Sequence, residues 1–249
     1  MLQNGALARV AMLSISSRLA RTAVALLMLA GCRSALPWAK EPIGDEVNLA
    51  FTIENNLVFF ESLTIDDRAG RYLFASAAPR SFVDPRHLAP DVPHLLQISE
   101  RESLRFSPAA LELQGVGDAV IGADVWGDKA VTVDYRLGMV IYQKRGIFPA
   151  YMELYRYQQE PAVMVSVDGR RFPAIVDTTS PDTLVLPRAG EDTRGTARVA
   201  VAGTDFGPID VRYDDVTAAR IGNRLLSKFL VTIDYGKRTV GLWRDPRLP

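Results

Sequence analysis

The chain has 249 residues, of which 48% are hydrophobic and 23% are charged, and its 29 basic and 29 acidic side chains balance. This length is enough to bury one large or two small hydrophobic cores. The charged residues form no long basic block, which argues against nucleic acid as a partner. Because Cys32 is the only cysteine, an internal disulfide is excluded.

The first 31 residues are organised like an export signal. They contain three arginines and no Asp or Glu, and they end in the apolar run 22–30. This run is shorter than the ~20 residues that a helix needs to cross a bilayer. The tetrapeptide LAGC at 29–32 resembles the lipobox of bacterial lipoproteins, in which the cysteine is acylated and becomes the new N-terminus.

That resemblance implies that residues 1–31 are a cleaved signal peptide, that Cys32 carries lipid and that residues 32–47 are a lipidated tether. The chain is then expected in the bacterial cell envelope, facing the periplasm, with membrane lipid as a partner through Cys32. Arg33 stands where an Asp would favour retention in the inner membrane, so the outer membrane is the expected address.

The remainder of the chain contains an internal repeat with an offset of 100 residues. Residues 121–135 read IGADVWGDKAVTVDY and residues 221–235 read IGNRLLSKFLVTIDY. Matching segments precede and follow each copy, which predicts two β-rich lobes, residues 48–144 and 161–246, joined by residues 145–160. The paired segments are a strand-turn-strand unit (57–74 and 161–176), a run of small or polar residues (75–78 and 177–180), a short strand (81–83 and 183–186) and a last strand (139–142 and 240–243).

The repeat resembles the retropepsin-type aspartic proteases in their bacterial two-lobe form. The sequence IVDT at 175–178 is similar to the catalytic turn of that family, and VIG at 120–122 and IG at 221–222 are similar to the later segments. Residues 225–229 match a short helix that follows. The resemblance implies an all-β fold of two homologous β-barrel-like lobes, each with a short helix.

The chemistry of that family needs one carboxylate from each lobe, because two carboxylates about 3 Å apart share a proton and together activate water. Here the first lobe departs from the pattern. Ala75, Ser76 and Ala77 stand where Asp, Thr and Gly belong. A methyl group can neither accept nor donate a proton, so the first-lobe turn is expected to be degenerate.

The second lobe keeps the candidate catalytic residues Asp177 and Thr178 but has Thr179 in place of Gly. A β-branched residue resists positive φ and adds bulk beside a substrate. Arg220 also replaces an apolar residue before the Ile-Gly pair. Whether the chain is an enzyme therefore stays open at this point.

Other residues could in principle replace the missing carboxylate. Asp84 and Asp182 follow the two turns and are expected to face solvent. Ser76 and Ser180 would be nucleophiles only beside a base, and the two histidines, His87 and His94, match no metal-ligand spacing. No metal site and no cofactor are expected.

Three functional hypotheses remain. In the first, the chain is a pseudoprotease that binds an extended peptide or protein in a groove between the lobes by β-strand addition. In the second, it is an active aspartic endopeptidase in which two chains bring two copies of Asp177 together as a homodimer. In the third, it is a structural lipoprotein. The sequence leaves the ligand and the oligomeric state open.

Overall fold

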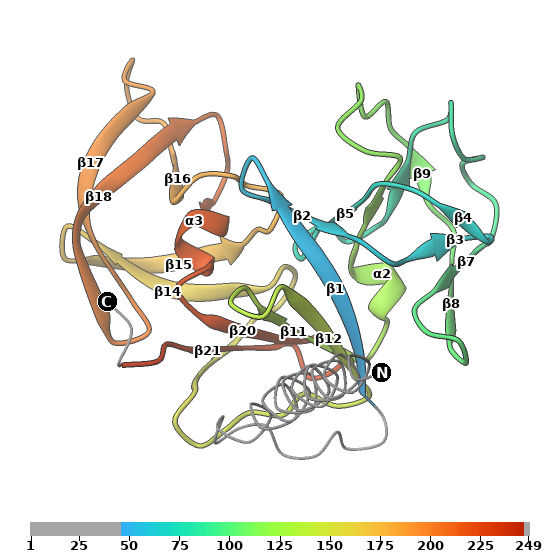
Figure 1. Ribbon diagram of the computed structural model, residues 1–249. Coiled ribbons are helices and arrows are strands. Elements are labelled where there is room, and N and C mark those ends of the chain that lie inside the picture. Colours follow the sequence, from blue (N-terminus) through green and yellow to red (C-terminus); the bar gives the residue numbers. More distant parts are fainter. Residues whose placement is uncertain (1–45, 247–249) are drawn as a thin grey trace, which may run out of the picture. The chain divides into compact units, whose positions relative to one another are not determined.

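The structure, a computed structural model, describes residues 46–246. The predicted signal peptide, the lipidation site at Cys32 and nearly all of the tether lie outside these residues. Strands dominate the regular structure, which confirms the all-β prediction (Figure 1). The described helices are α2 (Ala123–Trp126) and α3 (Asn223–Leu226), four residues each, and neither is long and apolar enough to span a membrane.

Six antiparallel strands from both lobes form one part of an eleven-stranded sheet, in the order β13-β21-β20-β11-β12-β1. At its middle, β11 pairs with β20 so that Thr132 lies opposite Thr232, and their Oγ1 atoms share a hydrogen bond of 2.8 Å. The repeated closing strands therefore meet each other at their own midpoints. The six strands are β1 (Glu46–Glu54), β11 (Ala130–Asp134), β12 (Met139–Gln143), β13 (Glu153–Arg156), β20 (Leu230–Asp234) and β21 (Thr239–Trp243).

Lobe 2 closes into a six-stranded barrel in the order β14-β15-β19-β16-β18-β17. The predicted hairpin β14–β15 is present, and its turn residues Asp168 and Gly169 both have positive φ. The long hairpin β17–β18 closes the barrel, because β17 pairs with β14 and β18 pairs with β16. The strands are β14 (Ala162–Val167), β15 (Arg170–Val176), β16 (Leu184–Pro187), β17 (Arg194–Val201), β18 (Thr204–Asp214) and β19 (Ala219–Ile221).

Lobe 1 does not close in this way, so the prediction of two barrel-like lobes is wrong for the first. Its strands continue the large sheet as β2-β5-β10-β6-β9, and β4-β3-β7-β8 form a separate sheet. The β7–β8 hairpin pairs with β3 and not with the large sheet, which leaves the lobe open. The strands are β2 (Leu57–Phe60), β3 (Thr64–Ile65), β4 (Arg68–Ala69), β5 (Tyr72–Phe74), β6 (Phe82–Val83), β7 (His94–Gln97), β8 (Ser103–Phe106), β9 (Ala109–Ala110) and β10 (Ala119–Ile121).

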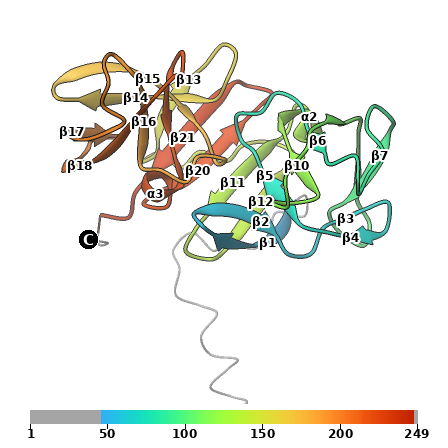
Figure 2. The ribbon, with the colours of Figure 1, turned by 90° about the horizontal axis from the view of Figure 1, so that it is seen from above.

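Figure 2 shows the consequence from above: β17 and β18 lie at one end, β3, β4 and β7 lie at the other, and the long sheet runs between them. The main apolar cluster takes buried side chains from both lobes, Trp126 and Leu226 among them. The turn after β5 therefore extends from the large sheet and the turn after β15 extends from the barrel, while Phe74 and Val176, the last residues of these strands, both lie in this shared core.

The glycine that precedes each short helix is explained by close packing. A Cβ on Gly122 would lie 2.8 Å from the carbonyl oxygens of Ala78 and Arg80, and a Cβ on Gly222 would lie 2.3 Å from that of Asp182. Each helix begins directly after this glycine. The second therefore begins at Asn223 and ends at Leu226, earlier than the predicted 225–229.

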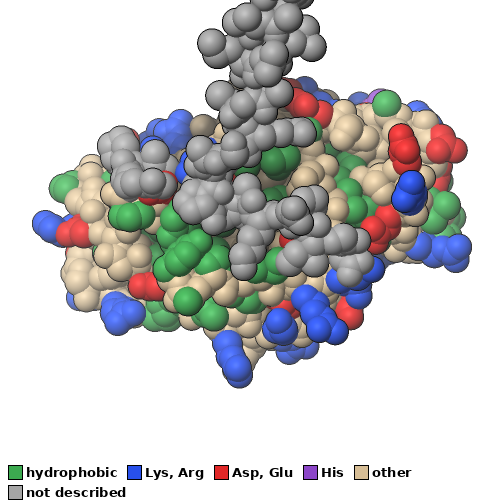
Figure 3. All heavy atoms as spheres, turned by 60° about the horizontal axis from the view of Figure 1, so that its bottom comes forward, with side chains coloured by type: hydrophobic (Ala, Val, Ile, Leu, Met, Phe, Trp, Pro, Cys, Tyr) green, Lys and Arg blue, Asp and Glu red, His purple; other side chains and the backbone are tan. Residues whose placement is uncertain are grey.

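The segment 145–160 that joins the lobes is more than a linker, because it contributes the edge strand β13. It also exposes apolar side chains: Ile147 is 45% exposed, Tyr151 57% and Leu154 53%. The ring of Tyr151 lies 5.2 Å from that of Trp243 on β21. Figure 3 shows one face of the molecule, on which apolar side chains gather in one area and Lys and Arg side chains lie along the lower rim.

Candidate functional site

Two turns of matching geometry follow β5 and β15. In each lobe the strand pairs in parallel with the Ile-Gly segment, as Phe74 with Ile121 and Val176 with Ile221. The next backbone N–H then donates to the isoleucine carbonyl at 3.0 Å, from Ala75 in lobe 1 and from Asp177 in lobe 2. The structure therefore places Ala75 and Asp177 at equivalent positions of the two lobes.

The residues after them, Ser76 and Thr178, form four hydrogen bonds between the lobes. Each backbone N–H donates to the hydroxyl oxygen of the other residue, at 2.9 Å and 3.0 Å. Each hydroxyl donates in turn to a carbonyl of the opposite strand: Ser76 Oγ to Val176 O at 2.6 Å and Thr178 Oγ1 to Phe74 O at 2.8 Å. Both side chains are fully buried, so every one of these groups depends on its partner in the other lobe.

Asp177 is 5% exposed, and both oxygens of its carboxylate accept hydrogen bonds. Thr179 donates to Oδ1 through its backbone N–H at 2.9 Å and its hydroxyl at 2.5 Å. Arg220 donates to Oδ2 through Nη1 at 2.8 Å. The two residues that depart from the family pattern are therefore the ones that bind this carboxylate. Thr179 does not adopt positive φ, so the strain expected from a β-branched side chain is absent at this residue.

The equivalent position in lobe 1 is apolar. Ala75 is fully buried in a cluster with Phe59, Leu73 and Val120, and Val120 is the counterpart of Arg220. We call this the lobe-1 apolar cluster. Four partly buried side chains cover it, namely those of Leu57, Ala78, Phe82 and Leu113. A carboxylate in this surrounding would lack the donors that Asp177 has.

The tyrosines of the repeated closing motif also connect the lobes. Tyr135 donates its hydroxyl to Asn223 Oδ1 at 2.8 Å, and Tyr235 donates its hydroxyl to Ser76 O at 3.0 Å. Asn223 passes the connection on, since its Nδ2 donates to Thr178 O at 2.7 Å. Burial raises the pKa of both tyrosines well above the ordinary value. Asn223 was not predicted from the sequence. The signal that could have pointed to such a contact was the tyrosine at the end of each repeated VT-x-DY motif.

The two acidic residues considered as replacements for the missing carboxylate, Asp84 and Asp182, each pair with an arginine. Asp84 was expected to face solvent, and this is wrong: its side chain is fully buried, because Arg86 binds both carboxylate oxygens and the Leu113 N–H donates to one. The Arg86 guanidinium holds the pKa of Asp84 well below its usual range. Asp182 is partly exposed and pairs with Arg212 at 3.0 Å.

No base stands beside either serine in the part of the chain that the structure describes. Ser76 Oγ is fully used by the interlobe bonds, and Ser180 Oγ is buried without a hydrogen-bond partner. His94 is buried and bonds to Asp66 Oδ2 at 2.5 Å and Ala89 O at 2.7 Å, while His87 lies 3.6 Å from Asp118. Within residues 46–246 no three His, Cys, Asp or Glu side chains gather in a way that could hold a metal ion.

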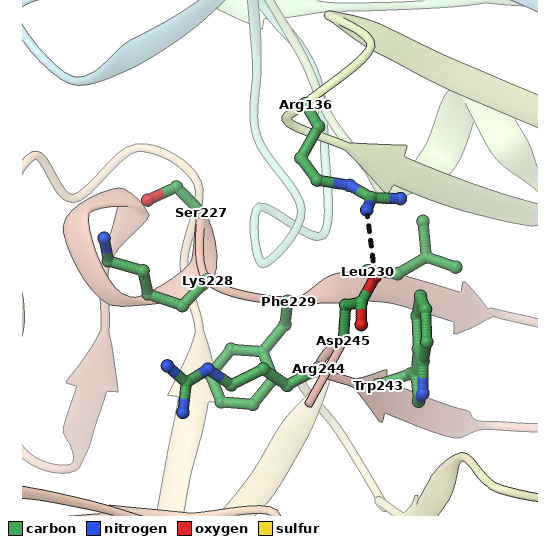
Figure 4. Close-up of a pocket in the computed structure, with 8 residues that line it drawn as sticks. All are labelled: Arg136, Ser227, Lys228, Phe229, Leu230, Trp243, Arg244 and Asp245. Atoms are coloured by element: carbon green, nitrogen blue, oxygen red, sulfur yellow. Dashed lines mark ion pairs between the residues drawn. The ribbon is translucent and has the colours of Figure 1, made fainter. Parts of the chain in front are cut away.

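A cavity of about 230 Å³ lies between the β11–β12 turn and the end of β21 (Figure 4). Arg136, from the turn, forms an ion pair with Asp245 at 3.7 Å across it. Phe229 is buried in its lining, and the Arg244 guanidinium lies 5.2 Å from the ring of Phe206. Arg136 and Asp245 thus bind each other, and the hydroxyl of Ser227 donates to the Arg224 carbonyl at 3.2 Å. The lining consists of Arg136, Ser227, Lys228, Phe229, Leu230, Trp243, Arg244 and Asp245.

No model of a known protein family matches this chain, and no curated protein matches it.

Proposed function

We propose that this protein is a cell-envelope lipoprotein with a retropepsin-like aspartic protease fold, and that it binds an extended peptide or protein segment without cleaving it. The observation that carries the proposal is the ion pair between Asp177 and Arg220. Asp177 occupies the position in lobe 2 that Ala75 occupies in lobe 1. The matched turns, the four interlobe hydrogen bonds made by Ser76 and Thr178 and the midpoint pairing of β11 with β20 support the family resemblance.

The loss of cleavage follows from proton chemistry. A shared proton requires two carboxylates whose charges repel, so that one is protonated and the other accepts a proton from water. In this chain the neighbouring group is the guanidinium of Arg220, which is not a carboxylic acid that can donate a proton to a peptide carbonyl. Oδ1 of Asp177 already accepts two hydrogen bonds and Oδ2 accepts one, so three of the about four acceptor sites of this carboxylate are occupied by the protein.

The surface around the two turns offers contacts for an extended chain. On lobe 1, Leu57, Phe82 and Leu113 lie partly exposed over the lobe-1 apolar cluster and can accept an apolar side chain. On lobe 2, Arg220 is about a third exposed and uses only Nη1 on Asp177, so its remaining N–H groups can donate to a peptide carbonyl. We infer a ligand with a large apolar residue beside a backbone carbonyl that Arg220 reaches.

Selection from a displayed random-peptide library by the purified full-length protein in detergent tests this function. Enriched peptides should carry a large apolar residue, and Arg220→Gln should weaken their binding roughly tenfold, as expected for the loss of a charged donor. Asp177→Asn should leave binding measurable, because the amide oxygen still accepts from Arg220. Arg198→Gln, an exposed change in an ion pair with Asp205, is the matched control. Absence of enriched peptides, or equal loss in both Arg variants, would sink the proposal.

The alternative, an active homodimer that brings two copies of Asp177 together, meets an obstacle in the same contacts. The groups of Thr178 that a second chain would have to engage are already bonded to Ser76 of the same chain. A dimer of second lobes would have to break all four interlobe bonds in each copy. The cleavage measurement described at the end of the Discussion distinguishes the two functions.

A further inference from the structure

A second cavity, of about 280 Å³, lies on lobe 2 among β17, β18 and α3, and none of its side chains contributes to the binding of Asp177. Three arginines line it, one from each of these elements: Arg194, Arg212 and Arg224. Two carboxylates, Asp182 and Asp210, are also in the lining. The cavity therefore concentrates guanidinium groups on a chain whose overall charges balance.

Among the described residues, only one of the three arginines has a counter-ion. Arg194 and Arg212 are directly opposite each other on the antiparallel pair β17–β18, and like charges at such positions repel. Arg212 pairs with Asp182 at 3.0 Å and with Asp214 at 3.3 Å. The side chains of Arg194 and Arg224 form no ion pair or hydrogen bond with any residue between 46 and 246.

One atom inside the cavity also lacks a hydrogen bond. The Nε of Arg212 is buried, and although Asp182 Oδ2 is 3.0 Å away, no acceptor is aligned with its N–H. A buried donor without an aligned acceptor costs free energy. The repulsion between Arg194 and Arg212 and the lack of a counter-ion for Arg194 and Arg224 among the described residues both favour an oxyanion in this cavity.

We propose that this cavity binds a phosphate monoester, either free or as a lipid headgroup. Guanidinium forks match phosphate oxygens in geometry and charge. The carboxylates of Asp182 and Asp210 reduce the positive charge, which disfavours large polyanions, and they accept hydrogen bonds from hydroxyl groups such as those of a sugar. The cavity volume of about 280 Å³ is several times the ~30 Å³ that one water molecule takes in the liquid. It therefore has room for a phosphate group and a small polar body beside it.

Calorimetric titration of the full-length protein in detergent tests this site with four probes: inorganic phosphate, glucose 6-phosphate, glucose and dihexanoyl phosphatidic acid. Glucose 6-phosphate is expected to bind more tightly than inorganic phosphate, and glucose not at all. Arg194→Gln and Arg224→Gln should each weaken phosphate-ester binding about tenfold. Arg198→Gln removes an exposed arginine from the same strand, outside the cavity, and should leave binding unchanged.

The probes also distinguish the two sources of the phosphate. Tighter binding of the lipid probe than of glucose 6-phosphate assigns the site to a headgroup, and the reverse order assigns it to a free ester. Circular dichroism of the variants checks that they fold, which their exposed positions favour. Absence of binding by all three phosphate probes, or an equal loss in Arg198→Gln, would overturn the proposal. The site is independent of the peptide-binding function, so either can fail alone.

Discussion

At the scale of single residues, Thr179 and Arg220, the two residues at which lobe 2 differs from the proteases that it resembles, together bind the carboxylate of Asp177. Thr179 in place of glycine adds a hydroxyl donor to one carboxylate oxygen, and Arg220 in place of an apolar residue adds a guanidinium to the other. Because Ala75 stands at the equivalent position of lobe 1, that turn supplies no carboxylate to pair with Asp177. The carboxylate of Asp177 accepts hydrogen bonds from Thr179 and Arg220 instead. These hydrogen bonds satisfy the polar oxygens of Asp177 in a nearly buried position.

Thr178 provides the sharpest test of the interlobe hydrogen bonds. Thr178→Val preserves the shape of the side chain but leaves the Ser76 N–H and the Phe74 carbonyl without their partner. Because each unsatisfied buried group costs about 1–3 kcal/mol, we expect the free energy of unfolding to fall by roughly 2–4 kcal/mol. Urea denaturation measures this loss.

The control for this prediction is Thr217→Val, which changes an exposed threonine of the same lobe. A surface substitution of this kind should alter the free energy of unfolding by less than about 0.5 kcal/mol. Equal effects of the two changes would mean that the Ser76–Thr178 bonds do not hold the turns together.

At the scale of elements, each short helix depends on the glycine before it. In Gly222→Ala the new Cβ would meet the carbonyl oxygens of Asp182 and Ser180 at 2.3 Å and 2.7 Å, both of them backbone atoms. The turn that carries Asp177 must then shift away from α3, and we expect a loss of stability of about 1–3 kcal/mol. Gly190→Ala is the matched control, because no atom lies within 4 Å of its added Cβ. Thermal unfolding compares the two; similar melting temperatures would contradict the close packing.

Local patterns in the sequence predicted the elements of lobe 2 well. Asp168-Gly169 predicted the hairpin turn, and alternating apolar runs on either side predicted its strands. The repeated VT-x-DY motif predicted matching closing strands, and these pair with each other at Thr132 and Thr232. Each of these predictions depended on residues close together in the sequence.

The failures concern contacts that local sequence patterns do not predict, most of them between distant residues. The closure of lobe 1 depends on whether the β7–β8 hairpin pairs with the large sheet or with β3, which the composition of the hairpin does not reveal. Asp84 was misplaced because its partners, Arg86 and the Leu113 N–H, make a buried site for a carboxylate that looked exposed by its position in the chain. The pairing of Arg220 with Asp177 likewise spans 43 residues and needed the structure.

At the scale of the whole molecule, the lobes are joined by the hydroxyls of two partly buried tyrosines, Tyr135 and Tyr235, whose ionisation should weaken this connection. Burial raises the pKa of Tyr135 and Tyr235 above the ordinary value near 10. The unfolded chain therefore loses these protons first as the pH rises, so the stability that they contribute is present below about pH 10 and falls above it.

We expect the free energy of unfolding to decrease with increasing pH above about 10, and Tyr135→Phe to reduce the slope of this decrease. Denaturant unfolding at a series of pH values measures the slope. Tyr151→Phe, at a tyrosine that is 57% exposed, should leave the slope unchanged. A slope that is the same in Tyr135→Phe as in the unmodified protein would contradict the interlobe role of this hydroxyl.

One measurement tests most directly the proposal that the two-lobed body binds a peptide chain and does not cut it. The full-length protein in detergent is incubated with a diverse peptide library from about pH 3 to 7, where carboxylate dyads share a proton, and the products are analysed by mass spectrometry. We predict no cleavage at any pH. Cleavage that disappears in Asp177→Ala would contradict the account and would show that a second carboxylate reaches Asp177.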